Sequence, residues 1–382
     1  MENILLINTN YRDKGGEDTN FIDESYLLKK YYKTNSIIFS NKSKLNFFDF
    51  LAFFTSSNFL SNKKVKIEIN NSNSEFAYIH NTWFKANLGI FKILLESNIK
   101  IFIKIHNYRF ACTRFFLQKN HIKRNSTCML CNNSTKKNKL INKYFKESYL
   151  KSFLIILYGK KYYKILQNPN INLLVMSEFQ KKYLTELGFE QQKIKTLFNP
   201  ISVSAKNIYR SDSDYLVFAG RLSDEKGIYE LLQAWNNIGF SNLELKIIGS
   251  AYKFDYFDLS EYKKVNFLGE LDHSKTLKII ENSRGVVTAT KMYEVQPKLF
   301  FEAISKGIPV LFPNFGGMPE FFPENYCLKF EQFNYLDLEE KLKIFENKEK
   351  LENISNQVFN YYQKNFSNEI YLSKFNDILN NK

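Results

Sequence analysis

Residues 215–237, YLVFAGRLSDEKGIYELLQAWNN, are the stretch that decides the fold. Tyr215–Ala219 is a short apolar run closed by Gly220, which is the pattern of a buried strand. After Gly227, the segment Ile228–Asn237 places apolar residues at helical spacing. Because a buried strand, a glycine-containing turn and an amphipathic helix form the start of a βαβ unit, this stretch predicts a parallel sheet covered by helices.

The same alternation of short apolar runs and helical segments continues on both sides of this stretch. The strand candidates are Ile4–Ile7, Phe76–Ile79, Ile99–Ile105 and Leu173–Met176 in the first half, then Leu243–Ile248, Val265–Leu268, Val286–Ala289 and Pro309–Phe312. A helix is predicted over Glu178–Glu186, and residues 201–214 are polar and lack periodicity. We therefore expect an α/β protein of two Rossmann-like, doubly wound domains facing a cleft, with boundaries at 1–200, a linker at 201–214, and 215–360.

Charge and composition narrow the class further. The 382 residues carry 54 Lys+Arg and 39 Asp+Glu, a net charge of +15. Lys100 to Lys164 contain 16 basic residues and one acid, whereas residues 205–382 sum to −3, so the chain is not an even polycation. Four cysteines do not make a disulfide scaffold. No signal peptide precedes the first strand, and the apolar run Phe47–Phe54 is shorter than the ~18 residues of a spanning helix. We expect a cytoplasmic protein.

Two cations lie in the turn after the predicted strand Tyr215–Ala219. Arg221 and Lys226 stand at the start of a helix, where the dipole disfavours positive charge. An anion bound between them would remove that penalty, and a diphosphate has the appropriate charge and size. The alternative is that both are solvated surface side chains.

A second candidate site is the segment from Tyr293 to Ala303, YEVQPKLFFEA. Pro297 suits the first turn of a helix, with Glu294 in the preceding loop and Glu302 on the flank of the helix. Two carboxylates eight residues apart can hold two separated hydroxyl groups of one extended ligand. The alternative is one loop acid and one solvated helix acid.

The third candidate is the pair Gly15 and Gly16, which follows the first strand of the chain and precedes a helical pattern over Phe21–Tyr32. Glycines at such a turn let the backbone approach an anion closely. A plain tight turn would have the same pattern, because the G-x-G-x-x-G spacing is incomplete.

Taken together, these motifs resemble the family-four retaining glycosyltransferases of the GT-B fold, the glycosyl transferases group 1. Glu294 and Glu302 have the family's E-x7-E spacing. The turn 220–227, the Gly15-Gly16-Glu17 segment, Asn199-Pro200 and His106-Asn107-Tyr108-Arg109 also match it in order. The resemblance covers essentially the whole chain, and it departs at Val295, where the family usually has glycine.

The resemblance implies a role for each matching residue. Arg221 and Lys226 would bind the donor diphosphate, approached by Gly15 and Gly16. Glu302 would hold the nucleotide ribose, Glu294 a hydroxyl of the transferred sugar, and His106 would lie beside the anomeric region. Backbone amides near Pro297, Lys298 and Leu299 would contact sugar or phosphate. The implied catalytic residues are His106, Glu294, Arg221 and Lys226, and a C-terminal helix over 361–382 would return to the N-terminal domain.

The implied activity is transfer of a sugar from a nucleoside-diphosphate-sugar to a glycan or lipid-linked acceptor, in bacterial-type surface polysaccharide assembly. No cofactor and no metal are expected, and the acids Asp212 and Asp214 read as a solvated turn. Two alternatives remain: a sugar-nucleotide epimerase of the same shape, and a basic nucleic-acid-binding protein, which the paired carboxylates disfavour.

Two other features have open interpretations. Cys112, Cys128 and Cys131 have a C-x15-C-x2-C spacing that could hold structural zinc, although reduced loop thiols explain it too. The basic run 100–164 favours contact with an anionic membrane, at its inner face, over contact with nucleic acid. The membrane contact would be made by an interfacial helix at Tyr149–Leu166. The alternative is that this run is a solvated face. His80 ends a strand and reads as a structural histidine or as a second site histidine.

Overall fold

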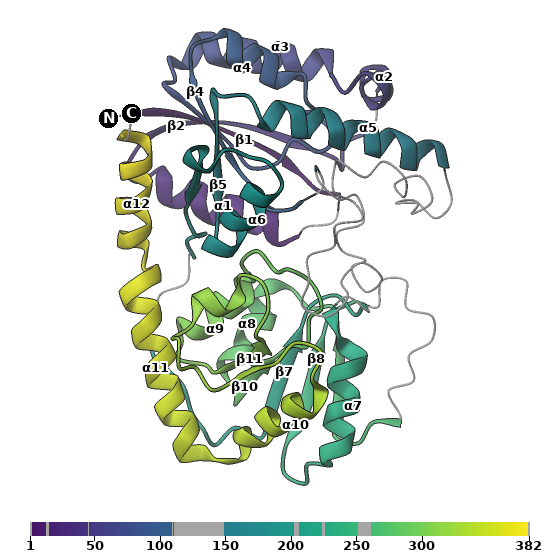
Figure 1. Cartoon of the computed structure of the whole chain (residues 1–382), viewed down its shortest axis with the longest axis vertical. Coiled ribbons are helices and arrows are strands. Elements are labelled where there is room, and N and C mark those ends of the chain that lie inside the picture. Colours follow the sequence, from purple (N-terminus) through teal and green to yellow (C-terminus); the bar gives the residue numbers. More distant parts are fainter. Residues whose placement is uncertain are drawn as a thin grey trace. The chain divides into compact units, whose positions relative to one another are not determined.

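The computed structural model describes residues 2–12, 15–44, 46–108, 110, 149–201, 206–223, 226–250 and 261–380. These residues form two compact units. The first contains the described residues up to 110, residues 149–201 and the C-terminal segment from 371, and the second contains residues 206–370. Each unit is built on one six-stranded sheet (Figure 1).

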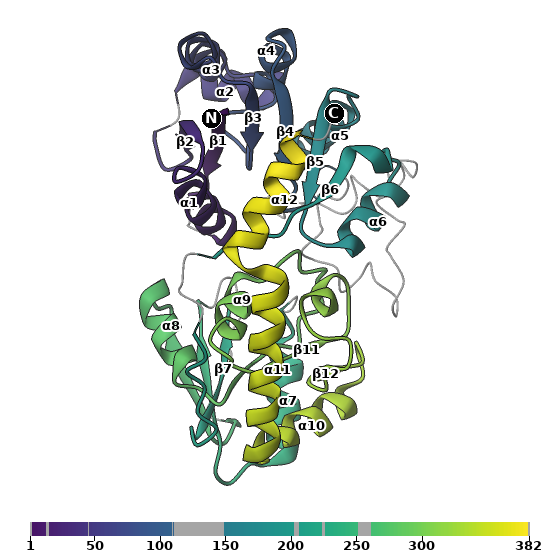
Figure 2. The same ribbon diagram turned by 90° about the vertical axis from the view of Figure 1, so that its left-hand side faces the viewer.

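All strand pairs in the first sheet are parallel, in the order β2-β1-β3-β4-β5-β6. Its strands are β1 (Asn3–Asn10), β2 (Lys33–Ser40), β3 (Phe76–Ile79), β4 (Lys100–Lys104), β5 (Ile171–Val175) and β6 (Ile194–Thr196). Its helices are α1 (Gly16–Leu28), α2 (Phe47–Thr55), α3 (Phe59–Ser72), α4 (Ile90–Glu96), α5 (Tyr149–Leu166), α6 (Glu178–Glu186) and α12 (Asn368–Asn380), with a 3-10 turn at Gln191–Lys193. Helices α3 and α4 cover one face of this sheet and α1 and α12 the other (Figures 1 and 2).

The second sheet is also parallel, in the order β12-β11-β10-β7-β8-β9. Its strands are β7 (Tyr215–Ala219), β8 (Glu244–Ile248), β9 (Val265–Gly269), β10 (Gly285–Val287), β11 (Val310–Pro313) and β12 (Lys329–Phe330). Its helices are α7 (Ile228–Ile238), α8 (His273–Glu281), α9 (Lys298–Ile304), α10 (Tyr335–Lys343) and α11 (Lys348–Phe366), with 3-10 turns at Met318–Phe321 and Ile344–Glu346.

The predicted α/β class with two doubly wound domains is confirmed, because the apolar runs are the central strands of two parallel sheets. Ile4–Ile7 are at most 1% exposed, as continuous burial on both faces requires. Three edge strands, β2, β6 and β12, were not predicted. Strands β6 and β12 have only three and two residues, and β2 is mostly polar with one short apolar run, Ile37–Phe39, in which Ile38 is exposed.

Two boundaries differ from the sequence prediction for physical reasons. Helix α1 begins at Gly16, five residues before the predicted start, because Asp18 accepts hydrogen bonds from the Gly15 and Tyr11 amides and caps it. In the segment predicted as a linker, residues 206–208 pack on the second unit: the Lys206 and Ile208 amides donate to the Ser305 and Lys306 carbonyls.

Helix α12 belongs to the first unit from Tyr371 onward. Tyr371, Phe375 and Leu379 are each at most 2% exposed, and they recur at helical spacing. The Phe375 ring lies 5.6 Å from Tyr78 of β3 and 5.5 Å from Tyr32. The last helix of the chain therefore forms part of the core of the first unit.

Candidate functional site

One group of candidate residues lies at the carboxyl edge of the second sheet. Strands β7 and β10 are parallel neighbours, so the segments that follow them meet at the same edge. Gly227 makes this approach possible: it has φ +67°, and a Cβ there would lie 1.8 Å from the Ala289 carbonyl oxygen. Only glycine permits so close a contact in that conformation. The turn after β7 is thereby held against the segment after β10.

This approach brings Lys226 and Glu294 together. The Lys226 Nζ lies 2.6 Å from Glu294 Oε1, and both side chains are partly exposed. The hydroxyl of Thr290 donates to the same oxygen at 3.0 Å. Two residues that the sequence predicted for one site are therefore in contact, 68 positions apart in the chain.

Arg221 stands two residues after β7, in the same turn, and its side chain is exposed. The turn is anchored to the next strand through its backbone, because the amides of Gly220 and Leu222 donate to the carbonyls of Ile248 and Ser250. Leu222 is buried beneath it. Arg221 therefore projects from a turn whose backbone is held in place by hydrogen bonds and by the buried Leu222.

Glu302 differs from the expectation of a carboxylate on the helix flank. Its side chain is 1% exposed, in the second turn of α9. His273 Nε2, at the start of α8, lies 3.0 Å from its Oε1 and 3.1 Å from its Oε2, and Lys298 Nζ is 3.8 Å from Oε1. A buried carboxylate requires such partners, because leaving it unpaired in a low-dielectric interior is costly. Sequence reasoning missed His273, since no motif spacing links it to a residue 29 positions later.

The other residues predicted to bind the donor lie at the start of helix α9. Pro297 is the residue before α9, with φ −68°, and Lys298 and Leu299 form its first turn. Val295 is half-buried in the loop before it. Nearby, the rings of Tyr293 and Phe315 stack with centroids 4.6 Å apart, and both are mostly buried.

Gly15 and Gly16 lie at the start of α1 in the first unit. The Gly15 amide donates to Asp18 Oδ2 at 3.2 Å, and burial raises the pKa of that carboxyl, opposed by its hydrogen bonds from the Gly15 and Tyr11 amides. A Cβ at either glycine would meet no atom within 4 Å. Packing within the chain therefore does not require glycine at these positions.

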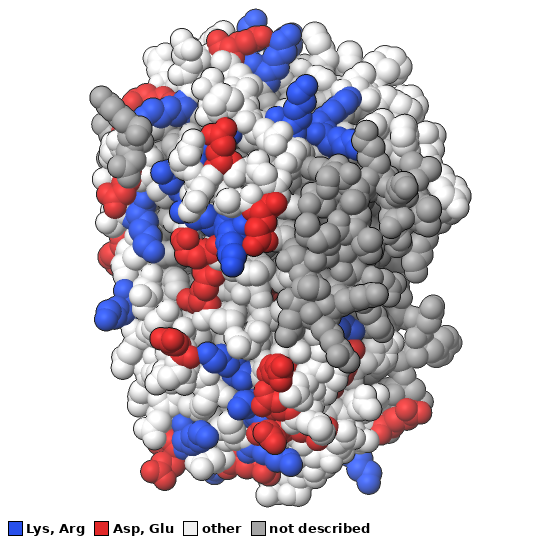
Figure 3. Space-filling model, viewed as in Figure 1, with Lys and Arg blue, Asp and Glu red and all other residues white. Residues whose placement is uncertain are grey.

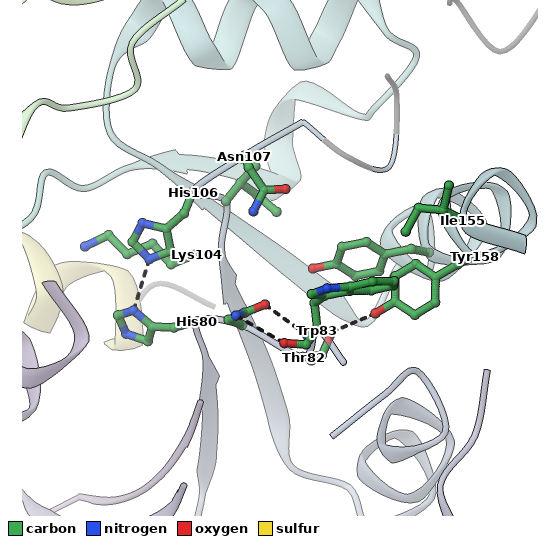
Figure 4. Close-up of a pocket in the computed structure, with 11 residues that line it drawn as sticks. His80, Thr82, Trp83, Lys104, His106, Asn107, Ile155 and Tyr158 are labelled. Atoms are coloured by element: carbon green, nitrogen blue, oxygen red, sulfur yellow. Dashed lines mark hydrogen bonds between the residues drawn. The ribbon is translucent and has the colours of Figure 1, made fainter. Parts of the chain in front are cut away.

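A second group of polar residues surrounds His106 in the first unit. His80 follows β3 and His106 follows β4, so the two neighbouring parallel strands bring them together. His80 Nδ1 and His106 Nε2 are 3.1 Å apart, and the rings stack with centroids 5.2 Å apart (Figure 4). On the other side of His80, its Nε2 lies 3.5 Å from Glu24 Oε2. His80 is therefore a member of the site as well as a buried residue.

Glu24 is fully buried and is held by residues from three elements, β3, β4 and α12. Its Oε1 accepts hydrogen bonds from the Tyr78 hydroxyl at 2.6 Å, from Lys104 Nζ at 2.9 Å and from the Tyr371 hydroxyl of α12. Lys104 also donates to the Phe198 carbonyl at 3.2 Å. No motif in the sequence indicates this cluster, because its members are far apart along the chain.

Burial sets the protonation of this group. It lowers the pKa of His106 to about 4, opposed by the nearby carboxylates of Glu17 and Glu24, and it lowers the pKa of His80 well below its usual range. Burial also lowers the pKa of Lys104, opposed by its ion pair with Glu24. Both histidines are therefore neutral at pH 7.

A recess in the first unit opens beside the two histidines (Figure 4). Its lining combines aromatic rings with amide and hydroxyl groups, a composition suited to the faces and hydroxyls of sugars. The lining residues are His80, Asn81, Thr82, Trp83, Lys104, Ile105, His106, Asn107, Ile155, Tyr158 and Tyr162. The Asn107 amide donates to Glu17 at 2.9 Å, which ties the recess to the start of α1.

Some predicted residues cannot be placed. Cys112, Cys128 and Cys131, Arg109, Asp224 and Glu225 lie outside the described residues. Within the described ranges, no three His, Cys, Asp or Glu side chains are grouped so as to hold a metal ion. No helix in that part of the chain is long and apolar enough to cross a membrane.

Comparison with known proteins defines the class. Residues 203–363 match the family described as "Glycosyl transferases group 1". A segment of 117 residues is 34% identical to an uncharacterized glycosyltransferase of Methanocaldococcus jannaschii, and the alignment covers 29% of this chain and 30% of the length of that relative.

Similar solved structures extend over the whole chain. Sucrose-phosphate synthase from Thermosynechococcus elongatus is similar with a TM-score of 0.70 at 13% identity, covering 99% of this chain and 98% of that one. The HepE protein of Anabaena, in complex with UDP and glucose, is similar with a TM-score of 0.67 at 13% identity, covering 99% of both chains. The fold, with its two parallel six-stranded sheets, is therefore GT-B-like. Over residues 203–363, which lie in the second unit, the chain is therefore similar to the glycosyl transferases group 1 family.

Proposed function

We propose that this glycosyltransferase moves a sugar from a nucleoside-diphosphate-sugar to a hydroxyl group of a glycan or lipid-linked acceptor, with retention of anomeric configuration. The observation that carries the proposal is the grouping of Lys226, Glu294 and Thr290 at the carboxyl edge of the second sheet, on the turn that also holds Arg221. Ligands of doubly wound folds bind at that edge.

The chemistry follows from the charge that develops during transfer. The bond between the anomeric carbon and the β-phosphate oxygen breaks, and the anomeric carbon forms a bond to the acceptor oxygen. The acceptor's proton passes to the departing nucleoside diphosphate. Arg221 and Lys226 stabilise the negative charge that grows on the leaving group. Glu294 forms an ion pair with Lys226, and a bound diphosphate would take over the neutralisation of this lysine.

The two carboxylates would bind the two ends of the donor. Glu302 would accept hydrogen bonds from the ribose hydroxyls, with His273 and Lys298 holding it in place. Glu294 would bind a hydroxyl of the sugar. Backbone groups near Pro297, Lys298 and Leu299 would contact the sugar or the phosphate.

In the first unit, Gly15 and Gly16 would allow a phosphate close to the start of α1. The open space at their Cα atoms supports this, because a side chain there would fill it. His106 would contact the transferred sugar. The Anabaena HepE structure contains UDP and glucose, so uridine diphosphate is the first donor nucleotide to test.

The test is a thermal-shift titration of the full chain with UDP, GDP, CDP and CMP. A ligand at about 100 times its Kd adds about 2.7 kcal/mol to the free energy of unfolding, a rise of several degrees in Tm. We expect one diphosphate to stabilise the wild type and not the Arg221→Ala/Lys226→Ala variant. The matched control is Lys306→Ala, which removes a partly buried cation paired with Glu281 at the other end of α9 and should retain the shift. A folded wild type that responds to no nucleotide would refute the donor site.

We further propose that the first unit docks on an anionic membrane through α2. Phe47, Phe50, Leu51 and Phe54 recur at i, i+3, i+4 and i+7, and they are 68%, 61%, 39% and 45% exposed. This apolar stripe faces away from the unit, contrary to the usual orientation of a surface helix. Phe59 and Leu60, at the start of α3, extend the exposed apolar surface.

Charge favours a bilayer as the occupant of this surface. Residues 41–67 contain five lysines and one acid, Asp49, whose charge is neutralised by the buried Lys85 at 2.5 Å. Lys160, Lys161 and Lys164 of α5 are exposed, and Figure 3 shows basic side chains gathered over this helix. Exposed aromatic residues among lysines are typical of surfaces that bind anionic lipid headgroups.

The exposed apolar residues support this role for α2 better than for α5. In α5, the predicted interfacial helix, Leu154 and Tyr158 are buried in the core of the unit. Only the beginning of α5, at Tyr149, Leu150 and Phe153, exposes apolar side chains. The apolar periodicity of α5 therefore serves packing, and the proposed surface moves to α2.

Co-sedimentation with vesicles tests this surface. We expect the wild type to bind phosphatidylcholine vesicles containing 30% phosphatidylglycerol more tightly than pure phosphatidylcholine. Phe50→Ser/Phe54→Ser should weaken binding about tenfold or more, since each ring contributes on the order of 1–3 kcal/mol when buried. The control Leu336→Ser replaces a residue that is 74% exposed on α10. Unchanged binding of the double variant, or occupation of this face by a second copy in a dimer, would overturn the proposal.

A further inference from the structure

The two carboxylate oxygens of Glu24 have different surroundings. Oε1 accepts three hydrogen bonds, from Tyr78, Lys104 and Tyr371. Oε2 is buried and accepts no well-aligned hydrogen bond from any described residue; the nearby His80 Nε2 lies 3.5 Å from it. A buried carboxylate oxygen needs a donor, because leaving it unpaired costs about 1–3 kcal/mol or more. The proton of the neutral His80 ring is therefore best placed on Nε2.

That proton fixes the direction of the next hydrogen bond. A neutral imidazole carries one proton, so a His80 ring protonated on Nε2 has a lone pair on Nδ1. His80 Nδ1 lies 3.1 Å from His106 Nε2, and one of these two atoms must donate. His106 must then carry its proton on Nε2. The opposite arrangement would direct the His80 Nε2 lone pair at the Glu24 carboxylate, and two acceptors would repel each other in a buried site.

We propose that Glu24 and His80 are positioning residues that hold His106 as the Nε2-protonated tautomer, so that its Nδ1 accepts a hydrogen bond from a hydroxyl group of the sugar substrates. The assignment of the tautomer rests on the contacts among these three residues, and the role of Nδ1 rests on the proposed function. Hydrogen-bond donation runs from His106 to His80 and from His80 to Glu24.

The residues on Oε1 give this arrangement its rigidity. Lys104 compensates the carboxylate charge, and the Tyr78 and Tyr371 hydroxyls fix the plane of the carboxylate. The ring of His80 is held by Phe21, with centroids 5.0 Å apart, and by Tyr78 at 4.7 Å. Because these contacts come from β3, β4, α1 and α12, the orientation of His106 depends on the docking of the last helix of the chain.

Nitrogen-15 NMR of the histidine rings tests the tautomer directly, with no need for activity. The chain has four histidines, and His273 in the second unit serves as an internal reference. We expect His106 in the wild type at pH 7 to show a protonated, pyrrole-type Nε2 and an unprotonated, pyridine-type Nδ1. His80→Phe keeps an aromatic ring and removes the acceptor, so His106 should become a mixture of both tautomers. A proton on Nδ1 in the wild type, or no change in His80→Phe, would overturn the proposal.

Kinetics test the consequence for transfer. Glu24→Gln and His80→Phe should lower kcat by about 10²-fold, as expected for misorientation of a group at the reaction centre. The KM for the donor and the nucleotide-dependent rise in Tm should stay near the wild-type values, because Arg221 and Lys226, the cations proposed to bind the diphosphate, lie in the second unit. Unchanged kcat in folded variants would refute the positioning role. Loss of transfer in every form, with the NMR result intact, would count against the proposed function alone.

Discussion

Replacement of Gly227 by alanine should destabilise the second unit far more than the same change at Gly239. Both glycines flank α7, and both have left-handed backbone conformations, with φ +67° and φ +64°. They differ in the space at Cα. A Cβ at Gly227 would lie 1.8 Å from the Ala289 carbonyl oxygen, whereas at Gly239 the nearest atom, the Asn236 oxygen, is 4.0 Å away.

The magnitude follows from these two terms. Each substitution forces alanine into the left-handed region, which costs about 1–2 kcal/mol. At Gly227 the main chain after β10 must also move away from the new methyl group, and overpacking of this kind costs about 1–3 kcal/mol more. We expect a loss of about 2–5 kcal/mol for Gly227→Ala and about 1–2 kcal/mol for Gly239→Ala.

Calorimetric unfolding of the two variants measures the difference, at roughly 2–4 °C of Tm per kcal/mol for a domain of this size. Gly227→Ala should also weaken the stabilisation by nucleotide, because Lys226 and Glu294 would no longer be held in contact. Gly239→Ala should retain it. Equal losses of stability in the two variants would refute the conclusion that Gly227 is required by its close approach to Ala289.

Three further changes test other parts of the structure. Tyr371→Phe should cost about 0.5–1.5 kcal/mol by removing one hydrogen bond to Glu24, measured by urea unfolding, while Tyr361→Phe, with a 3.4 Å bond to a carbonyl, should cost less. Lys104→Met should cost about 3–5 kcal/mol because it leaves the Glu24 charge buried without its cation, against less than about 0.5 kcal/mol for the exposed Lys92→Met. The pKa of His106 is about 4 in the folded state, below the ordinary value of about 6.5, so the unfolded state binds more protons between these values. The free energy of unfolding should therefore fall as the pH falls from 6.5 towards 4, and it should fall less steeply in the His106→Asn variant. Equal pH dependence of the two proteins would contradict a neutral His106. The charged and titratable groups around this histidine are Glu17, Glu24, Lys104 and His80.

The central strands of both sheets could be predicted from the sequence, whereas the edge strands β2, β6 and β12 could not. Apolar runs such as Ile4–Ile7 and Tyr215–Ala219 are buried on both faces, so hydrophobicity alone identified them. The resemblance to the GT-B glycosyltransferases assigned Lys226 and Glu294 to one donor site, and the two side chains are in contact. The burial of Glu302 could not be anticipated, since it depends on His273 from another helix.

The cluster around Glu24 lay beyond sequence reasoning for a different reason. Glu24, Lys104 and Tyr371 each read as an ordinary residue of a helix or a strand. Glu24 and Tyr371 are 347 positions apart, and only the docking of α12 on the first sheet brings their side chains together. Pairing of buried charges across such distances leaves no periodic pattern in the sequence.

The two helices at the proposed membrane surface show why periodicity alone does not reveal which face is buried. Helix α5 and helix α2 both repeat apolar residues at helical spacing, yet α5 buries Leu154 and Tyr158 and α2 exposes Phe50 and Phe54. The difference lies in one polar residue. Asp49 of α2 accepts hydrogen bonds from Lys85 and Asn58 inside the unit, and this buried ion pair directs the polar side of α2 inward. With Asp49 held there, the four apolar residues of the stripe must face outward, because they occupy the opposite side of the same nine-residue helix.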